Sequence, residues 1–266
     1  MGILNVTPDS FSDGGLHFDR ERAIEAGLRM IEEGASIVDV GGESTRPGAA
    51  PVSAAAELER VVPVIEALAR RTTAVLSVDT SKPEVITAAL HAGAHLVNDV
   101  RAFRLPGALE AVAAHDAAVC VMHMRGEPAD MQDDPRYDDV VREVREFLLE
   151  RVAACRAAGI HGGSICVDPG IGFAKTAQHN LALLQNLHSF TELGGPLLVG
   201  VSRKRFIGEI TGVTNAADRI HGTTGANVAA LGAGARLFRV HDVRAAREAL
   251  DVAWAVMKAR AAGAPA

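Results

Sequence analysis

Eight short apolar segments, spaced along the whole chain, constrain the fold more than any other feature of the sequence. They are rich in Val, Leu and Ile without strict polar alternation, which is typical of strands buried on both faces. The segments span residues 2–6, 36–42, 74–79, 95–100, 118–123, 164–170, 196–202 and 236–243. Between them apolar residues recur at helical spacing, as in Val61, Ile65 and Leu68, with Glu and Arg on the opposite face. Strands alternating with helices predict a parallel sheet.

Eight such units in 266 residues match the size of a closed (β/α)₈ TIM barrel. We therefore predict an α/β fold of this type, with one domain over residues 1–266. An open doubly wound sheet is the alternative, but that fold usually has a GxGxxG turn after its first strand. No such turn follows residues 2–6, so the closed barrel is favoured.

Composition excludes several classes of protein. The net charge of -6 gives no basic surface for nucleic acid. No apolar run approaches the roughly 18 residues needed to cross a bilayer, and the first residues lack the features of a secretory signal. Cys120, Cys155 and Cys166 show no metal-binding or disulfide spacing, so we expect buried, reduced thiols. We predict a cytoplasmic protein without nucleic-acid or membrane partners.

Every predicted strand ends in polar or charged residues. They are Asn5, Glu43, Ser44, Thr45, Arg46, Asp79, Asn98, Asp99, His123, Asp168, Ser202, Arg203, Lys204, Arg239 and His241. In a parallel barrel all these strand ends lie on one rim, where barrel enzymes have their active sites. Any one of these residues could be a helix N-cap, but their presence after all eight strands predicts a shared site. The polar segment 7–15, after the first strand, then forms part of that site.

The side chains on this rim favour a flat heterocycle as ligand. Asp79 and Asp168 can each accept two parallel N–H bonds from an amidine-like edge, while Asn98 offers an amide and Lys204 a cation. Each charge-assisted hydrogen bond would contribute about 1.5–3 kcal/mol. Left unpaired by a wrong ligand, the same buried groups would penalise its binding.

The last strand predicts an anion site next to this heterocycle. Arg239 and His241 are two residues apart, so both side chains point the same way, beside Asn5 because the barrel closes there. Glycine-rich turns can add backbone N–H groups for phosphate oxygens. The predicted ligand is a planar heterocycle that carries phosphate. The histidines elsewhere, such as His91, His115 and His188, are expected to be solvated.

Several motifs, in this order, resemble those of the dihydropteroate synthase family. They are ILNVTPDSFSDGG, GGESTRPG, SVDTSKP, Asn98-Asp99-Val100, MHMRG, DPGIGFAK, VSRK and RVHDV. The resemblance spans Gly2 to about Val243. It implies a (β/α)₈ barrel and a transferase of folate biosynthesis that is a sulfonamide target. The reaction would join (7,8-dihydropterin-6-yl)methyl diphosphate to 4-aminobenzoate, giving 7,8-dihydropteroate and diphosphate, with Mg²⁺ and in a homodimer.

The resemblance also implies a role for individual residues. Asp79, Asn98, Asp168 and Lys204 would hold the pterin, and Asn5 would bind Mg²⁺. Thr45, Arg239 and His241 would hold the diphosphate, and Arg46 would be a further substrate-binding residue. Phe11, Pro47 and Phe173 would line the aminobenzoate pocket, and Asp13 would face the reacting carbon. Asp13, Lys204, Arg239 and His241 are the expected catalytic residues. We expect loss of diphosphate before attack by the amine, which is a weak nucleophile.

Two departures from the family pattern leave alternatives open. Ala174 occupies a position that is commonly Gly, and Arg205 follows Lys204 where many relatives have a small hydroxyl residue. A non-catalytic folate-pathway paralogue is therefore one alternative. A pterin-binding methyltransferase would share the Asp/Asn pocket but does not need the anion clamp, and an aldolase that forms a Schiff base on Lys204 is a third.

Overall fold

The computed structural model describes residues 1–7, 15–44, 51–126, 131 and 135–261. Its strands are β1 (Gly2–Asn5), β2 (Ile37–Gly41), β3 (Val75–Asp79), β4 (Leu96–Asp99), β5 (Ala118–Met122), β6 (Ile165–Asp168), β7 (Leu198–Val199) and β8 (Leu237–Phe238). All eight lie inside the segments predicted from the sequence. The last two are the shortest.

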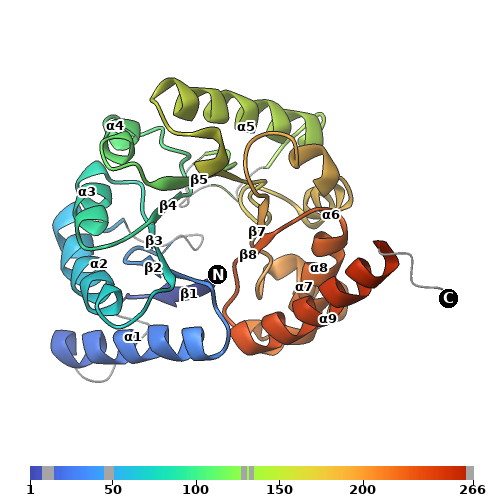
Figure 1. Ribbon diagram of the computed structural model, residues 1–266. Helices are drawn as coiled ribbons and strands as arrows, with labels where there is room; N and C mark the ends of the chain where they lie inside the picture. The colour runs from blue at the N-terminus through green and yellow to red at the C-terminus, as the bar shows by residue number, and fades with distance from the viewer. Residues whose placement is uncertain (8–14, 45–50, 127–130, 132–134, 262–266) are drawn as a thin grey trace.

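Helices follow the strands. They are α1 (Gly15–Glu32), α2 (Ala54–Ala69), α3 (Pro83–His91), α4 (Ala108–Ala113), α5 (Val140–Ala157), α6 (Ala177–Gln185), α7 (Arg205–Thr211), α8 (Ile220–Gly232) and α9 (Val243–Ala261), with 3₁₀ turns η2 (Gly162–Ser164), η3 (Leu187–Phe190) and η4 (Ala216–Asp218). Figure 1 shows them as an outer ring around the strands. Among the described helices, none is both long and apolar enough to cross a membrane.

The strands close into a barrel through two narrow joints. Strands β1 to β6 form one parallel sheet in chain order, and β7 pairs with β8. Parallel bridges join Val167 to Leu197 and Gly2 to Val240, so the two sheets meet on both sides. At the second joint the Ile3 N–H donates to the Val240 carbonyl at 2.9 Å. The predicted (β/α)₈ barrel is confirmed.

Residues along each strand alternate between the barrel interior and the helices. Val38, Val40, Val78 and Val97 are fully buried in the core between sheet and helices. Their neighbours point into the barrel, because successive side chains of a strand face opposite sides. At the floor these inward residues are apolar and pack together: Ile37, Leu96, Ala118, Cys120, Cys166, Leu198 and Leu237. Nearer the carboxyl ends the inward positions become polar, which creates the site.

Candidate functional site at the mouth of the barrel

The inward-facing positions at the carboxyl ends of the strands form a polar layer inside the barrel. Register places Asp39 beside Ser77, and Asp79 beside Asn98. Asp168 ends β6 opposite Met122 on β5. All of these polar side chains are buried. A polar layer of this kind is stable only if its groups satisfy one another or a ligand.

Arg239 lies at the centre of this layer and donates a hydrogen bond to each of two carboxylates. Its Nε donates to Asp39 Oδ2 at 2.7 Å and one terminal nitrogen donates to Asp79 Oδ2 at 2.6 Å. Ser77 Oγ donates to Asp39 Oδ1 at 2.5 Å, and Asn98 Nδ2 donates to Asp39 Oδ2 at 3.2 Å. Arg239 is thus held by two carboxylates of the layer, and its role in an anion clamp stays a prediction.

Two carboxylates sharing one guanidinium perturb the ionisation of the site. Burial raises the pKa of Asp79 to about 7; the Arg239 charge opposes this rise and the nearby Asp39 charge adds to it. Burial alone would lower the pKa of Arg239, but the charges of Asp39 and Asp79 raise it overall. The guanidinium therefore stays charged, while Asp79 gains or loses a proton near neutral pH.

Asp168 and Lys204 form the second half of the layer. Asp168 Oδ1 accepts the Gly170 N–H at 2.7 Å. Lys204 Nζ donates to the Ile171 carbonyl and lies 4.4 Å from the centre of the Phe173 ring. Burial raises the pKa of Asp168, and the Lys204 charge opposes that rise. Burial lowers the pKa of Lys204 to about 8, against the attraction of Asp168.

Gly200, just after β7, keeps space open between these groups. A Cβ at this position would lie 4.0 Å from both Asp168 Oδ2 and Lys204 Nζ, and 3.8 Å from Arg239 Cβ. Any longer side chain would therefore extend among the three. Acceptors and cations converge on one open point, where a flat polar molecule could meet all of them.

Asn5 and His241 flank the layer where the barrel closes. Asn5 Oδ1 and Asp79 Oδ2 lie 3.8 and 3.7 Å from the position of a Cβ on Gly41, so both face the same gap. Ser202 Oγ accepts the His241 backbone N–H at 3.1 Å and lies 3.0 Å from His241 Nδ1. The hydroxyl can donate to Nδ1 or accept from it, so this contact orients the ring in either tautomer; with the proton on Nε2, the ring would present a donor there.

Other predicted site residues fall outside the described part of the chain. Phe11, Asp13, Thr45, Arg46 and Pro47 lie in the segments 8–14 and 45–50, which the structure does not describe. The roles given to them stay predictions.

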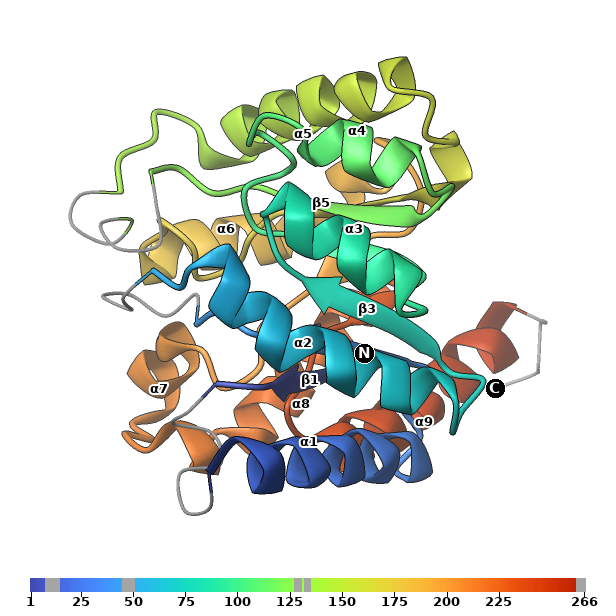
Figure 2. The same ribbon diagram turned by 90° about the vertical axis from the view of Figure 1, so that its left-hand side faces the viewer.

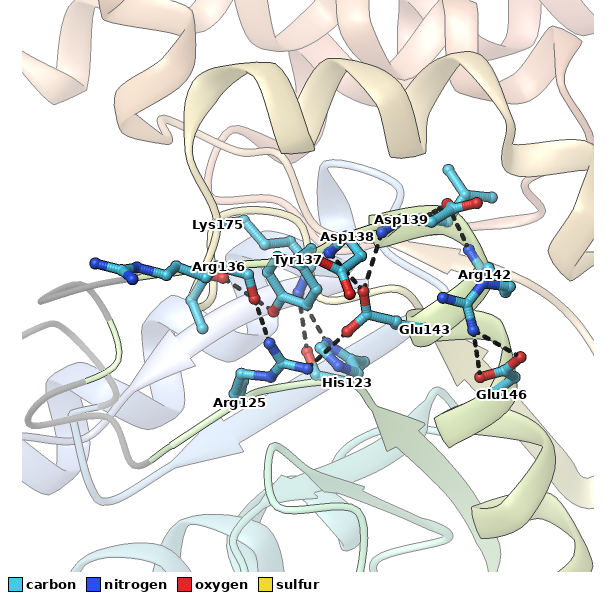
Figure 3. A network of polar contacts seen from close by, with 12 residues as sticks. His123, Arg125, Arg136, Tyr137, Asp138, Asp139, Arg142, Glu143, Glu146 and Lys175 are labelled. Atoms are coloured by element: carbon cyan, nitrogen blue, oxygen red, sulfur yellow. Dashed lines mark hydrogen bonds and ion pairs between the residues drawn. The ribbon is translucent and has the colours of Figure 1, made fainter.

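The loop after β6 is fixed by Lys175 and Tyr137, which the sequence analysis did not single out, together with His123 of the predicted rim. Lys175 is buried, and its Nζ lies 2.9 Å from the Phe173 carbonyl and 3.0 Å from His123 Nδ1. Burial lowers the pKa of His123 to about 2, so the ring is neutral and can accept. Tyr137 donates to the Ala174 carbonyl at 3.0 Å. These contacts join the β5–α5 loop to the loop that carries Phe173 (Figure 3).

Further polar contacts support the same loops from outside. Arg125 pairs with Glu143 at 2.7 Å and lies 4.5 Å from the Tyr137 ring centre. Glu143 also accepts the Asp138 and Asp139 N–H groups at 2.9 and 3.0 Å (Figure 3). The start of α5 is thereby tied to the end of β5.

Two residues of the predicted rim, and one of the two departures from the family pattern, point away from the site. Asp99 accepts from Ser81 Oγ and from the backbone N–H of Arg101 and Phe103. Arg203 pairs with Asp242 through two hydrogen bonds at 2.9 and 2.5 Å. Arg205, one of the two departures, has a side chain 82% exposed that pairs with Glu209 at 2.8 Å on α7.

Asp39 is the main site residue that sequence reasoning missed. Its one signal is that it is the only charged residue within the apolar segment 36–42. Its position in mid-strand, rather than at a strand end, kept it out of the predicted rim.

A separate hollow of about 270 Å³ lies at the opposite end of the barrel. It is lined by Met1, which precedes β1, and by residues of β8 and α9, including Phe238, Leu250 and Trp254. None of the predicted site residues borders it, so the polar layer and this hollow are distinct.

Comparison with known proteins agrees with the chemistry of the layer. The family model described as "Pterin binding enzyme" matches residues 1–241. Dihydropteroate synthase of Escherichia coli (strain K12) is 50% identical over 260 residues, covering 98% of this chain and 92% of that protein.

Solved structures give the same result. Yersinia pestis dihydropteroate synthase, in a sulfonamide drug complex, has a TM-score of 0.92 at 49% identity, covering 97% of this chain and 94% of that one. The Xanthomonas albilineans enzyme with 4-aminobenzoic acid has a TM-score of 0.91 at 53% identity, with 97% and 92% covered. With its barrel, its buried polar mouth and this degree of identity over nearly its whole length, the chain belongs to the dihydropteroate synthase family of pterin binding enzymes.

Proposed function

We propose that the chain joins (7,8-dihydropterin-6-yl)methyl diphosphate to 4-aminobenzoate at the mouth of the barrel, releasing diphosphate and 7,8-dihydropteroate for folate biosynthesis. The observation that carries this proposal is the polar layer of Asp79, Asn98, Asp168, Lys204 and Arg239, buried in a chain 50% identical to a dihydropteroate synthase. Since a relative binds 4-aminobenzoic acid and another binds a sulfonamide, we expect both to bind here.

Recognition of the pterin would depend on the buried acceptors. Asp168 has one oxygen engaged by Gly170, and the other faces the space beside Gly200. That oxygen could accept N–H groups from the amino-pyrimidine edge, while Lys204 donates to a ring oxygen or nitrogen. Each such bond would add about 1.5–3 kcal/mol. A ligand lacking those groups would leave them desolvated and unpaired, which gives specificity.

The chemical step would begin with departure of the diphosphate. The dihydropterin ring can delocalise the positive charge left on its methylene carbon, and the arylamine then attacks a stronger electrophile. When ionised, Asp39, Asp79 and Asp168 outnumber the cations Arg239 and Lys204 in the layer, so the field favours a cation there.

Residues at the closing joint of the barrel would act on the leaving group. His241 would donate from Nε2 to a diphosphate oxygen. Arg239 could turn toward the same oxygens once the ligand competes for Asp79. Asp13 is proposed to face the reacting carbon, and Phe11, Pro47 and Phe173 to border the amine substrate. Thr45 and Arg46 are proposed as further diphosphate ligands.

The donors at this joint suit Mg²⁺. Within the described residues no hydrogen bond occupies the Asn5 amide oxygen, and no group of three or more His, Cys, Asp or Glu forms a metal cage. Mg²⁺ prefers oxygen ligands and is commonly held by few protein groups together with substrate phosphates and water. We propose that Asn5 contributes one ligand and the diphosphate others. When bound, the ion would neutralise charge on the departing diphosphate.

A homodimer is proposed on the basis of one helix face. The exposed residues Gly225, Val228, Ala229 and Gly232 of α8 are all small or apolar, and α8 packs beside α9 (Figure 1). A second copy could cover this face closely because, beyond the exposed His221 in the first turn of α8, these four residues have no long side chains. Sedimentation analysis of the parent and of Val228→Glu would test the proposal; equal monomer mass in both would contradict it.

We also propose a cytoplasmic location, because all three cysteines are free and buried.

The proposed reaction is tested by measuring diphosphate release with purified protein. Release should require both the pterin diphosphate and 4-aminobenzoate, with 7,8-dihydropteroate formed in equal amount. Asp168→Asn should weaken pterin binding more than tenfold, whereas Glu66→Gln on the surface of α2 should change nothing. Binding without release would indicate a non-catalytic paralogue, and transfer of a methyl group from methyltetrahydrofolate to a corrinoid protein would indicate a methyltransferase.

A further inference from the structure

Two histidines from different helices meet on the outside of the barrel, away from the polar layer. His91 is the last residue of α3, and His115 follows the end of α4. Helices of a (β/α)₈ barrel run opposite to the strands, so these helix ends lie at the floor end (Figure 2). The two Nε2 atoms are 3.1 Å apart and the ring centres 4.7 Å apart. His91 is exposed, as expected from the sequence, and the two rings also contact each other.

The end of α4 fixes the tautomer of His115. The backbone N–H of His115 bonds to the Val112 carbonyl, and that of Ala114 bonds to the Glu110 carbonyl. The Ala111 carbonyl between them is contacted by His115 Nδ1 at 2.8 Å. A carbonyl can only accept, so Nδ1 carries the proton. In the neutral ring, Nε2 therefore presents a lone pair to His91. The same Nδ1–H to carbonyl bond orients most metal-ligating histidines.

The spacing of the two nitrogens matches a shared metal ion. With metal–nitrogen bonds of about 2.0–2.1 Å, two adjacent ligands stand about 2.9 Å apart at a right angle and about 3.4 Å apart in a tetrahedron. The observed 3.1 Å falls between these limits. We propose that His91 and His115 bind one divalent transition-metal ion of the imidazole-preferring class, Zn²⁺, Ni²⁺ or Cu²⁺, by replacing the proton they share.

The surroundings leave such an ion accessible. His91 is exposed and ends a groove between α3 and α4, lined also by Pro83, Thr87 and Gly107. In the described part of the chain no third His, Cys, Asp or Glu completes a cluster with the pair. Water would fill the remaining coordination positions. Because the ion would join the ends of two helices, its binding should stabilise the fold without touching the mouth of the barrel.

Calorimetric titration tests this site. The full-length protein, without an affinity tag, is titrated with Zn²⁺, Ni²⁺ or Cu²⁺ chloride at pH 7.5. The parent should bind one ion that His91→Ala and His115→Ala each weaken at least tenfold. His188→Ala, which removes an exposed histidine on η3, should bind like the parent. At a hundredfold excess over Kd, the ion should raise the parent Tm by about 5 °C. Neither His91 nor His115 variant should show that rise.

The result that overturns the proposal is an unchanged affinity and Tm shift in the His91→Ala protein, which loses only an exposed side chain. Equal losses in His188→Ala would also overturn it, since binding would then be nonspecific. Electron paramagnetic resonance of the Cu²⁺-loaded parent should show coupling to two imidazole nitrogens, and one or none would contradict the paired site. The test needs no turnover, so its outcome is independent of the proposed reaction.

Discussion

Asp39→Asn is expected to lower the free energy of unfolding by about 2 kcal/mol and to move the acid limb of pterin binding to lower pH. Asp39 is fully buried and bonded to Arg239, Ser77 and Asn98. An Asn of the same shape keeps these partners, because its oxygen can accept from Arg239 and Asn98 while Ser77 turns its hydroxyl to accept. The substitution removes only the charge.

The magnitude follows from the contacts. A hydrogen bond to a charged group contributes about 1.5–3 kcal/mol against about 0.5–1.5 for a neutral one. With Asn at position 39 the two bonds to Ser77 and Asn98 become neutral, at a cost of about 1 kcal/mol each, whereas the bond to Arg239 still has a charged donor. Arg239 stays paired with Asp79 in this variant. The free energy of unfolding therefore does not fall by the full 3–5 kcal/mol, roughly, that an unpaired buried charge costs. At about 2–4 °C per kcal/mol, Tm should fall by about 4–8 °C.

The pH effect depends on Asp79. Its pKa is raised to about 7 by burial and in part by the Asp39 charge. Below that pH Asp79 is protonated, and a neutral acid accepts from the pterin more weakly than a carboxylate does, so binding in the parent should weaken up to tenfold per pH unit below about 7. With Asn at position 39, Asp79 is the one carboxylate paired with the guanidinium. Removing a neighbouring negative charge lowers the pKa of a carboxyl group by about one unit or more. The acid limb should move down by that amount.

Urea unfolding at pH 8 and calorimetric binding of the pterin diphosphate from pH 5 to 9 would measure both effects. Asp99→Asn is the matched control, because Asp99 is equally buried but bonds to Ser81 and two backbone N–H groups outside the layer. It should destabilise the fold and move the acid limb less than Asp39→Asn does, because the Asp99 charge raises the pKa of Asp79 less than the Asp39 charge does. An unmoved limb in Asp39→Asn, or an equal shift in Asp99→Asn, would refute the reasoning.

Three further substitutions probe the rest of the site. Lys204→Arg should extend pterin binding above pH 8, where the parent loses its ammonium because burial lowers the pKa of Lys204 to about 8; an unchanged basic limb in calorimetry would contradict this. Gly170→Ala should cost at least about 3 kcal/mol in urea unfolding, because φ is +69° and a Cβ would overlap the His123 carbonyl; a loss under 1 kcal/mol would be inconsistent with that backbone. Lys175→Met should raise the KM for 4-aminobenzoate several-fold by releasing Phe173, and an unaltered KM would exclude that role.

The strands and the barrel could be predicted because buried parallel strands have a strong signal. Each apolar segment is bounded by turn residues, and eight of them alternate with helical periodicity. The polar layer was predictable only in part. Asp79 and Asp168 end their strands and Asn98 is next to the end of β4, so they are easily noticed, whereas Asp39 lies in mid-strand. When both faces of a strand are buried, the sequence does not show which side chains point into the barrel and which point toward the helices.

Adjacent residues illustrate this limit. Asn98 faces the layer and Asp99 faces the helices, because successive side chains alternate. The role of Lys175 could not be predicted, because it joins the Phe173 carbonyl of its own loop to His123, which is distant in the sequence. Ala174, a departure from the family pattern, has φ of 51° in the left-handed region that favours Gly, so the backbone explains the usual residue there.

The most direct measurement for the polar layer as the pterin site is a crystal structure of the chain with (7,8-dihydropterin-6-yl)methyl diphosphate. We predict the pterin beside Gly200, with the free Asp168 oxygen and Lys204 Nζ within hydrogen-bond distance of its ring, and the diphosphate near His241. A pterin bound in the hollow at the barrel floor, or one with no contact to Asp168, would contradict the account.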